Sequence, residues 1–143
     1  MKRIPSPLAM LAVLVVANLI LLIAGCASIP RTAADVAGTY NLQTIAGYPL
    51  PWLVLSGAVK REVTAGHWQL NSDMTYSFSA INRYTRQDGV VRTETRLETG
   101  TFTVSGSSLT FKETGETRSY TGSLVGKTLT IIEGGYAIVF VKP

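Results

Sequence analysis

From Gly38 to Val141 the chain is a succession of short segments with β-strand character, separated by turn signals about every 8–12 residues. Apolar and polar residues alternate within the segments, which are rich in threonine, valine, isoleucine and aromatic residues. No segment after Val36 shows sustained helical periodicity. The pattern predicts an all-β domain of eight strands, over residues 38–45, 58–70, 75–84, 91–104, 109–111, 117–124, 128–132 and 136–141.

The connections between these strands are mostly short, as in the hairpin signal Gln87-Asp88-Gly89. Short connections place sequence neighbours side by side, which gives an antiparallel up-and-down meander. Eight such strands in water must bury one face and protect two edges, and closure into a barrel does both. We therefore expect an eight-stranded antiparallel up-and-down β-barrel; the same pattern also permits a two-sheet sandwich.

The strand over 91–104 carries a row of alternating charges. Its charged side chains recur at every second residue, which puts them on one face: Arg92, Glu94, Arg96 and Glu98. Alternating charge is typical of a solvated surface, so we expect this row to face water. Val91, Thr93, Thr95 and Leu97 would then lie behind it.

The N-terminal segment has the layout of an export signal. Lys2 and Arg3 precede an apolar run of 17 residues from Leu8 to Ala24, which is predicted as a hydrophobic helix. The length is at the lower limit of the roughly 17–25 residues that span a membrane, so length alone does not exclude a transmembrane anchor. The expected organisation is a signal peptide over 1–25, a tether over 26–37 and a barrel domain over 38–143.

The chain's single cysteine, Cys26, stands where the apolar run ends. The segment Ile23-Ala24-Gly25-Cys26 resembles the lipobox of bacterial lipoprotein signals. The resemblance implies cleavage before Cys26, a diacylglycerol on its thiol and an acyl chain such as palmitate on the new amine. Several acyl chains anchor a protein stably to a membrane. It further implies an exported protein in the cell envelope, and Ala27 in place of aspartate favours the outer over the inner membrane of a Gram-negative cell.

A glycine followed two residues later by an aromatic residue recurs at Gly38-Thr39-Tyr40, Gly66-His67-Trp68 and Gly100-Thr101-Phe102. In a barrel, glycine relieves crowding where a strand coils, and the ring fills the space. With the segments 45–51, 66–76, 129–131 and 136–140, these motifs resemble the small bacterial lipocalin-like domains of the calycin group. The candidate ligand-lining or core residues are the aromatic side chains expected to point inward: Tyr40, Trp68, Tyr76, Phe78, Phe102, Phe111 and Phe140.

The resemblance implies binding of a small apolar ligand, but two features leave open a solid interior. The sequence stops at Pro143, two positions after the last strand, where larger lipocalins place a helix against the barrel, and an eight-stranded barrel can be filled by its own side chains. The apolar stretch after Pro51 supplies a candidate lid over one barrel end or a contact patch for an envelope protein: Trp52, Leu53 and Leu55. The two hypotheses are therefore a ligand-binding lipoprotein and a solid-barrel interaction lipoprotein that acts as an inhibitor or assembly accessory.

Enzymatic chemistry is not expected. His67 is the only histidine and Cys26 the only thiol, so the sequence predicts no metal site and no cofactor. No serine stands in a Gly-x-Ser-x-Gly elbow, and no glycine-rich phosphate loop opens a helix. Basic residues are dispersed, which argues against nucleic acid as a partner. The expected partners are a membrane through the N-terminal lipid, a small apolar molecule and an envelope protein.

Overall fold

The computed structural model describes residues 31–143, so the expected signal over 1–25 and the lipidation at Cys26 lie outside the described residues. Within these described residues, one short helix, α2 (Ala33–Val36), precedes the strands. The strands are β1 (Gly38–Ile45), β2 (Tyr48–Pro49), β3 (Trp52–Leu55), β4 (Val59–Leu70), β5 (Thr75–Arg86), β6 (Val91–Ser105), β7 (Ser108–Glu113), β8 (Ser119–Val125), β9 (Thr128–Glu133) and β10 (Tyr136–Val141).

Eight of these strands close into a barrel. Each strand from β4 to β10 pairs antiparallel with its neighbour in sequence, and β1 pairs with β10 on one side and with β4 on the other. The closing pair matches Tyr40 with Trp68 and Gly38 with Leu70. The predicted antiparallel up-and-down barrel is therefore confirmed, and the sandwich alternative is excluded because no sheet edge separates β1 from β4.

The segment between β1 and β4 contains two short strands that the sequence did not predict. β2 pairs with the end of β1, where Pro49 lies opposite Thr44, and β3 pairs with β4. Proline cannot donate to the ladder, but Pro49 is tolerated because β2 is an edge strand, which needs no donor on its outer side. The segment consequently crosses one end of the barrel and rejoins the sheet.

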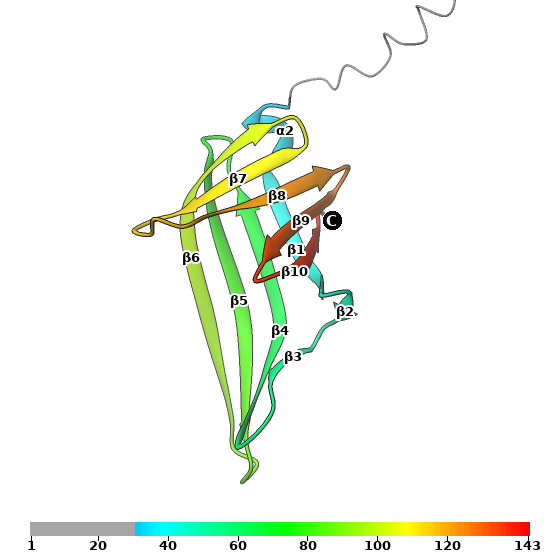
Figure 1. Cartoon of the computed structure of the whole chain (residues 1–143), viewed down its shortest axis with the longest axis vertical. Helices are drawn as coiled ribbons and strands as arrows, with labels where there is room; N and C mark the ends of the chain where they lie inside the picture. The colour runs from blue at the N-terminus through cyan, green and yellow to red at the C-terminus, as the bar shows by residue number, and fades with distance from the viewer. Residues whose placement is uncertain (1–30) are drawn as a thin grey trace, which may run out of the picture.

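The strands differ greatly in length, and this gives the barrel two unlike ends. β4, β5 and β6 have 12, 12 and 15 residues, whereas β7 to β10 have six or seven. Figure 1 shows the three long strands continuing far beyond the short ones, with β3 running beside them. The long strands share the barrel wall at one end and form a projecting ribbon at the other.

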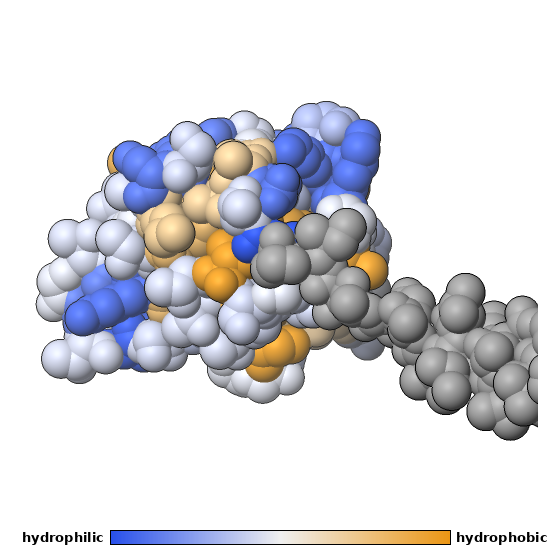
Figure 2. Space-filling view, turned by 90° about the horizontal axis from the view of Figure 1, so that it is seen from above, coloured by the Kyte–Doolittle hydropathy of each residue, from blue (hydrophilic) through white to orange (hydrophobic). Residues whose placement is uncertain are grey.

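The helix α2 covers the barrel end opposite the ribbon (Figure 1), which we call the closed end. Its Val36 is fully buried, the Tyr40 hydroxyl donates to the Val36 carbonyl at 2.7 Å, and Arg31 Nη1 donates to the Leu124 carbonyl at 2.7 Å. Residues 31–37 were expected to belong to a tether but instead pack on the barrel. Viewed from this end, the described surface mixes hydrophobic residues with hydrophilic ones (Figure 2).

The charged row on β6 faces the opposite way from the prediction. Glu98 is buried and Arg96 lines the barrel interior, whereas Leu97 is 75% exposed on the outside. Gly100 and Phe102, which follow at the same two-residue spacing, are also buried. The prediction of a solvated row is correct for Arg92, Glu94 and Arg96, whose side chains are 69%, 45% and 49% exposed, and wrong for Glu98. The inner face of β6 passes from the barrel into the ribbon, where charges on that face still reach water.

Within residues 31–143, no helix has the length and the hydropathy of a bilayer-spanning segment.

Candidate functional site

The closed half of the barrel is filled by side chains. Trp68 lies at its centre, with ring centroids 4.5 Å from Tyr76 and 4.7 Å from Phe111. Phe111 stacks on Tyr120 at 5.7 Å. Buried aliphatic residues complete this core: Leu70, Leu109, Leu124, Leu129 and Ile131. Rings and leucines leave this half solid, so a ligand has to enter the other half.

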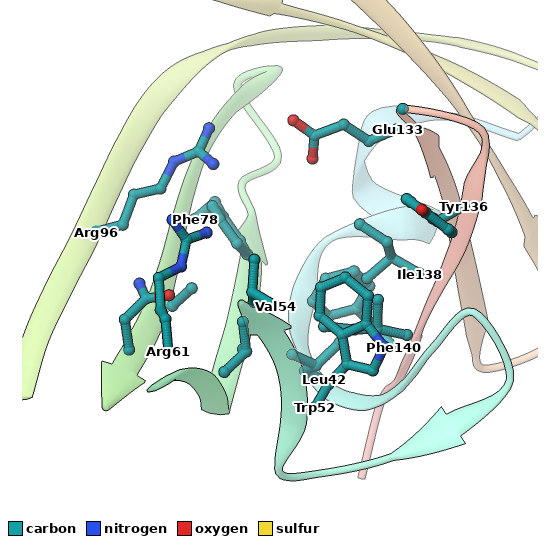
Figure 3. A pocket seen from close by; sticks show the side chains of 15 residues that line it. Leu42, Trp52, Val54, Arg61, Phe78, Arg96, Glu133, Tyr136, Ile138 and Phe140 are labelled. Atoms are coloured by element: carbon teal, nitrogen blue, oxygen red, sulfur yellow. The ribbon is translucent and has the colours of Figure 1, made fainter. Parts of the chain in front are cut away.

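The half next to the ribbon contains a cavity of about 270 Å³ that opens to solvent. Its volume is just below the range of about 300–1,000 Å³ of pockets for drug-sized molecules, so it suits a small ligand. Its wall is mainly apolar and includes Leu42, Trp52, Val54, Phe78, Ile138 and Phe140. Figure 3 shows these side chains converging from β1, β3, β5 and β10. The barrel interior is therefore half filled and half hollow.

Four polar side chains also line the cavity, and three of them carry charge: Arg61, Asn82, Arg96 and Glu133. Figure 3 shows the guanidinium groups of Arg61 and Arg96 turned into the cavity from β4 and β6, and the Glu133 carboxylate entering from β9. Asn82 lies on β5 between the two arginine-bearing strands. The Glu133 carboxylate also lies 3.9 Å from the guanidinium group of Arg118, a residue that does not line the cavity. The cavity thus combines a large apolar wall with a cationic corner.

Glu98 orients the Arg96 side chain through a hydrogen bond. Its Oε2 atom accepts from Arg96 Nη2 at 3.0 Å, while Oε1 accepts from the Tyr76 hydroxyl at 3.1 Å and from the Tyr120 hydroxyl. The two hydroxyls lie 2.9 Å apart. Burial raises the pKa of Tyr76 to about 12, and burial together with the hydrogen bond to Glu98 raises the pKa of Tyr120. Both phenols therefore stay protonated as donors, and one carboxylate orients three partners.

The candidate lid residues separate into two faces of β3. Trp52 lines the cavity and packs edge-on against Tyr136 of β10, with ring centroids 5.9 Å apart. Leu53 and Leu55 point outward and are 47% and 57% exposed. Alternation along the strand explains the split, since successive side chains of a strand face opposite sides. Trp52 therefore belongs to the cavity mouth, and the two leucines belong to the outer surface.

The seven inward aromatic candidates all lie inside the barrel, but only Phe78 and Phe140 border the cavity. Tyr40, Trp68, Tyr76, Phe102 and Phe111 belong to the filled half. The sequence reasoning missed Arg61 and Arg96 as lining residues. Arg96 could have been predicted, because it lies six positions before Phe102 on β6 and therefore faces the same side of the strand.

Arg61 had no comparable signal in the sequence. A register shift on β4 between Val63 and Ala65 reverses the alternation of side chains along the strand, so that Trp68 and Arg61 both face inward although they are seven positions apart. The irregularity lies just before Gly66. A bulge of this kind arises from strand pairing and cannot be located from local composition.

A closed eight-stranded antiparallel barrel with a cavity at one end defines a class of small-molecule-binding domains. A sequence model of the lipocalin-like domain matches residues 36–135, which is more than half of the 143-residue chain. The chain belongs to the lipocalin-like domain family, as its sequence motifs indicated. Comparisons with curated proteins and with solved structures found no match.

Proposed function

We propose that this protein binds a small, largely apolar molecule inside its barrel, and that an N-terminal lipid on Cys26 holds it on a membrane of the bacterial cell envelope. The cavity of about 270 Å³ carries the proposal, because its walls present Trp52, Phe78 and Phe140 to any occupant. Burial of an apolar ligand against such walls is worth roughly 25 cal/mol per Å². The proposed role is binding or sequestration, without catalysis.

The position of the described N-terminus supports an orientation on the membrane. Arg31 lies at the closed end, where it donates a hydrogen bond to the Leu124 carbonyl, and it is only five positions after Cys26. Five extended residues span at most about 18 Å. A lipid on Cys26 would therefore keep the closed end near the bilayer, with the cavity and the ribbon directed away from it. The ligand would then be exchanged with the aqueous compartment.

The alternative of a solid barrel that serves only as an interaction platform has less support. A cavity of this size contradicts a fully packed interior. The exposed Leu53 and Leu55 are compatible with a contact patch, but single exposed aliphatic side chains are normal on protein surfaces.

A cavity-filling substitution tests the proposed function. Ala80 lines the cavity, so Ala80→Phe should block uptake of an environment-sensitive apolar dye by the full chain. Thr95→Phe adds the same ring on the outer face of β6, where Thr95 is exposed, and should leave uptake unchanged. Absence of dye uptake by the unmodified protein, or equal uptake by both variants, would contradict binding in this cavity.

A further inference from the structure

The cavity is not uniformly apolar, and its polar groups are concentrated on one side. Arg61, Asn82 and Arg96 come from three adjacent strands, β4, β5 and β6. Figure 3 shows the two guanidinium groups on one side of the cavity and Leu42, Trp52, Ile138 and Phe140 on the other. An occupant that touches both sides must itself have a polar end and an apolar end.

Arg61 is the least satisfied of these groups. Its Nε atom is buried and has no hydrogen-bond partner among residues 31–143. The same part of the chain provides Arg61 with no carboxylate within 4.0 Å, although other arginines such as Arg83, Arg92 and Arg96 are paired. A buried, unpaired N–H of a charged group is costly, and a hydrogen-bonded anion removes that cost.

Arg96 has spare donors that point to the same region. A guanidinium group carries five N–H donors in a planar fork, and only one nitrogen of Arg96, Nη2, donates to Glu98. Because Glu98 also accepts from two tyrosines, it fixes the Arg96 side chain before any ligand arrives. The remaining edge of Arg96 and the amide of Asn82 can complete an anion site begun by Arg61.

The charge balance of the lining favours an anion over a cation. Two arginines and one carboxylate, Glu133, face the cavity, and Glu133 is itself within 3.9 Å of Arg118. Planar guanidinium groups match the geometry of carboxylate and phosphate. We propose that the ligand is an anionic amphiphile whose carboxylate or phosphate binds at Arg61, Asn82 and Arg96, while its short apolar chain lies against Trp52, Phe78 and Phe140. This proposal rests on the proposed function and specifies its ligand.

Three probes with the same chain and different heads test the proposal: octanoate, octanol and octylamine. Each is titrated into the full chain in phospholipid nanodiscs, with tryptophan fluorescence as the readout and empty nanodiscs as the background. Octanoate should bind at least about tenfold more tightly than the other two, as expected for charge-assisted hydrogen bonds. Arg61→Gln should reduce octanoate affinity by about tenfold and leave octanol affinity unchanged. Arg86→Gln removes an equal charge at the exposed tip of the ribbon and should change neither.

The outcomes separate this proposal from the one on which it rests. Equal affinity for octanoate and octanol would overturn the anion site while leaving an apolar cavity that binds ligands. Tighter binding of octylamine would also overturn it and would assign the head group to Glu133. Failure of all three probes to bind would overturn the proposed function together with the anion site. The probe comparison needs only the unmodified protein, so it remains decisive if Arg61→Gln does not fold.

Discussion

Tyr76 lies directly opposite Gly100 in the β5–β6 pairing, and its ring lies against the glycine. A Cβ added at Gly100 would stand 2.7 Å from Tyr76 Cε1 and would also clash with the Lys112 carbonyl oxygen. The glycine is therefore needed where the β6 backbone passes close to both β5 and β7. This contact explains the Gly100-Thr101-Phe102 motif: the small residue admits one ring, and Phe102 fills the space beside it.

The first prediction concerns that contact. Gly100→Ala should lower the free energy of unfolding by about 1–3 kcal/mol, because the backbone must shift to admit a methyl group. Denaturant unfolding, compared at constant m-value, measures the change. Gly57→Ala is the matched control, since a Cβ there meets no atom within 4 Å, and it should change stability by less than about 0.5 kcal/mol. Equal stability of the two variants would refute the packing argument.

The second prediction concerns the buried carboxylate of Glu98. Glu98→Ala leaves two tyrosine hydroxyls and Arg96 without their acceptor, which should cost about 2–3 kcal/mol of unfolding free energy. Glu94→Ala removes a carboxylate of the same strand whose side chain is 45% exposed and paired with Arg92. Such surface pairs contribute little, so the control should lose no more than about 0.5 kcal/mol. Similar losses in both variants would show that the network does not stabilise the barrel.

The third prediction follows from the raised pKa of Tyr76. The folded pKa of about 12 exceeds the ordinary value of 10.0 because of burial, so the folded protein holds the phenolic proton more tightly than the unfolded chain. This contribution to stability is present below pH 10 and is lost as pH rises through about 12. Unfolding free energy measured against pH should fall across this window. The fall should be smaller in Tyr76→Phe and unchanged in Tyr48→Phe, whose ring is 66% exposed; an undiminished fall in Tyr76→Phe would contradict the assignment.

The fourth prediction uses the two tryptophans as reporters. Trp52 lines the cavity mouth, whereas Trp68 is 3% exposed in the filled half. An apolar ligand should therefore change the emission of Trp52 most strongly. Trp52→Phe should abolish most of the ligand-induced fluorescence change, and Trp68→Phe should retain it. The reverse result would place the ligand outside the cavity.

The fifth prediction concerns membrane attachment. Cys26→Ala removes the thiol that would carry the lipid, so the variant should incorporate no labelled palmitate. Ser28→Ala, two residues further on, should be acylated like the unmodified chain. Acylation of Cys26→Ala would contradict the proposed lipid attachment at this residue.

Strand composition and turn chemistry made the barrel predictable. The strands β1 and β4 to β10 correspond to the eight runs seen in the sequence, and Asp88-Gly89 marks a tight turn in which Gly89 adopts a φ of 84°. Alternation along β5 also placed Tyr76, Phe78, Ala80 and Asn82 on one face, as the structure has them. These features are local, because they depend on each residue's backbone preference and on a period of two.

The amino-acid sequence by itself determined that the chain after Val36 forms antiparallel strands that pair in sequence order and carry aromatic rings on one face. The pairing of β1 with β4, which closes these strands into a barrel and not a sandwich, belongs to the tertiary structure. Only the tertiary structure decided which part of the interior is hollow and which charged side chains enter it. Period-two alternation divides a strand into two faces but does not say which face is inside. The β4 bulge between Val63 and Ala65 also reverses the alternation, so that Arg61 faces inward together with Trp68. The cavity with its two guanidinium groups arises from unequal strand lengths and non-local pairing, which no single segment encodes.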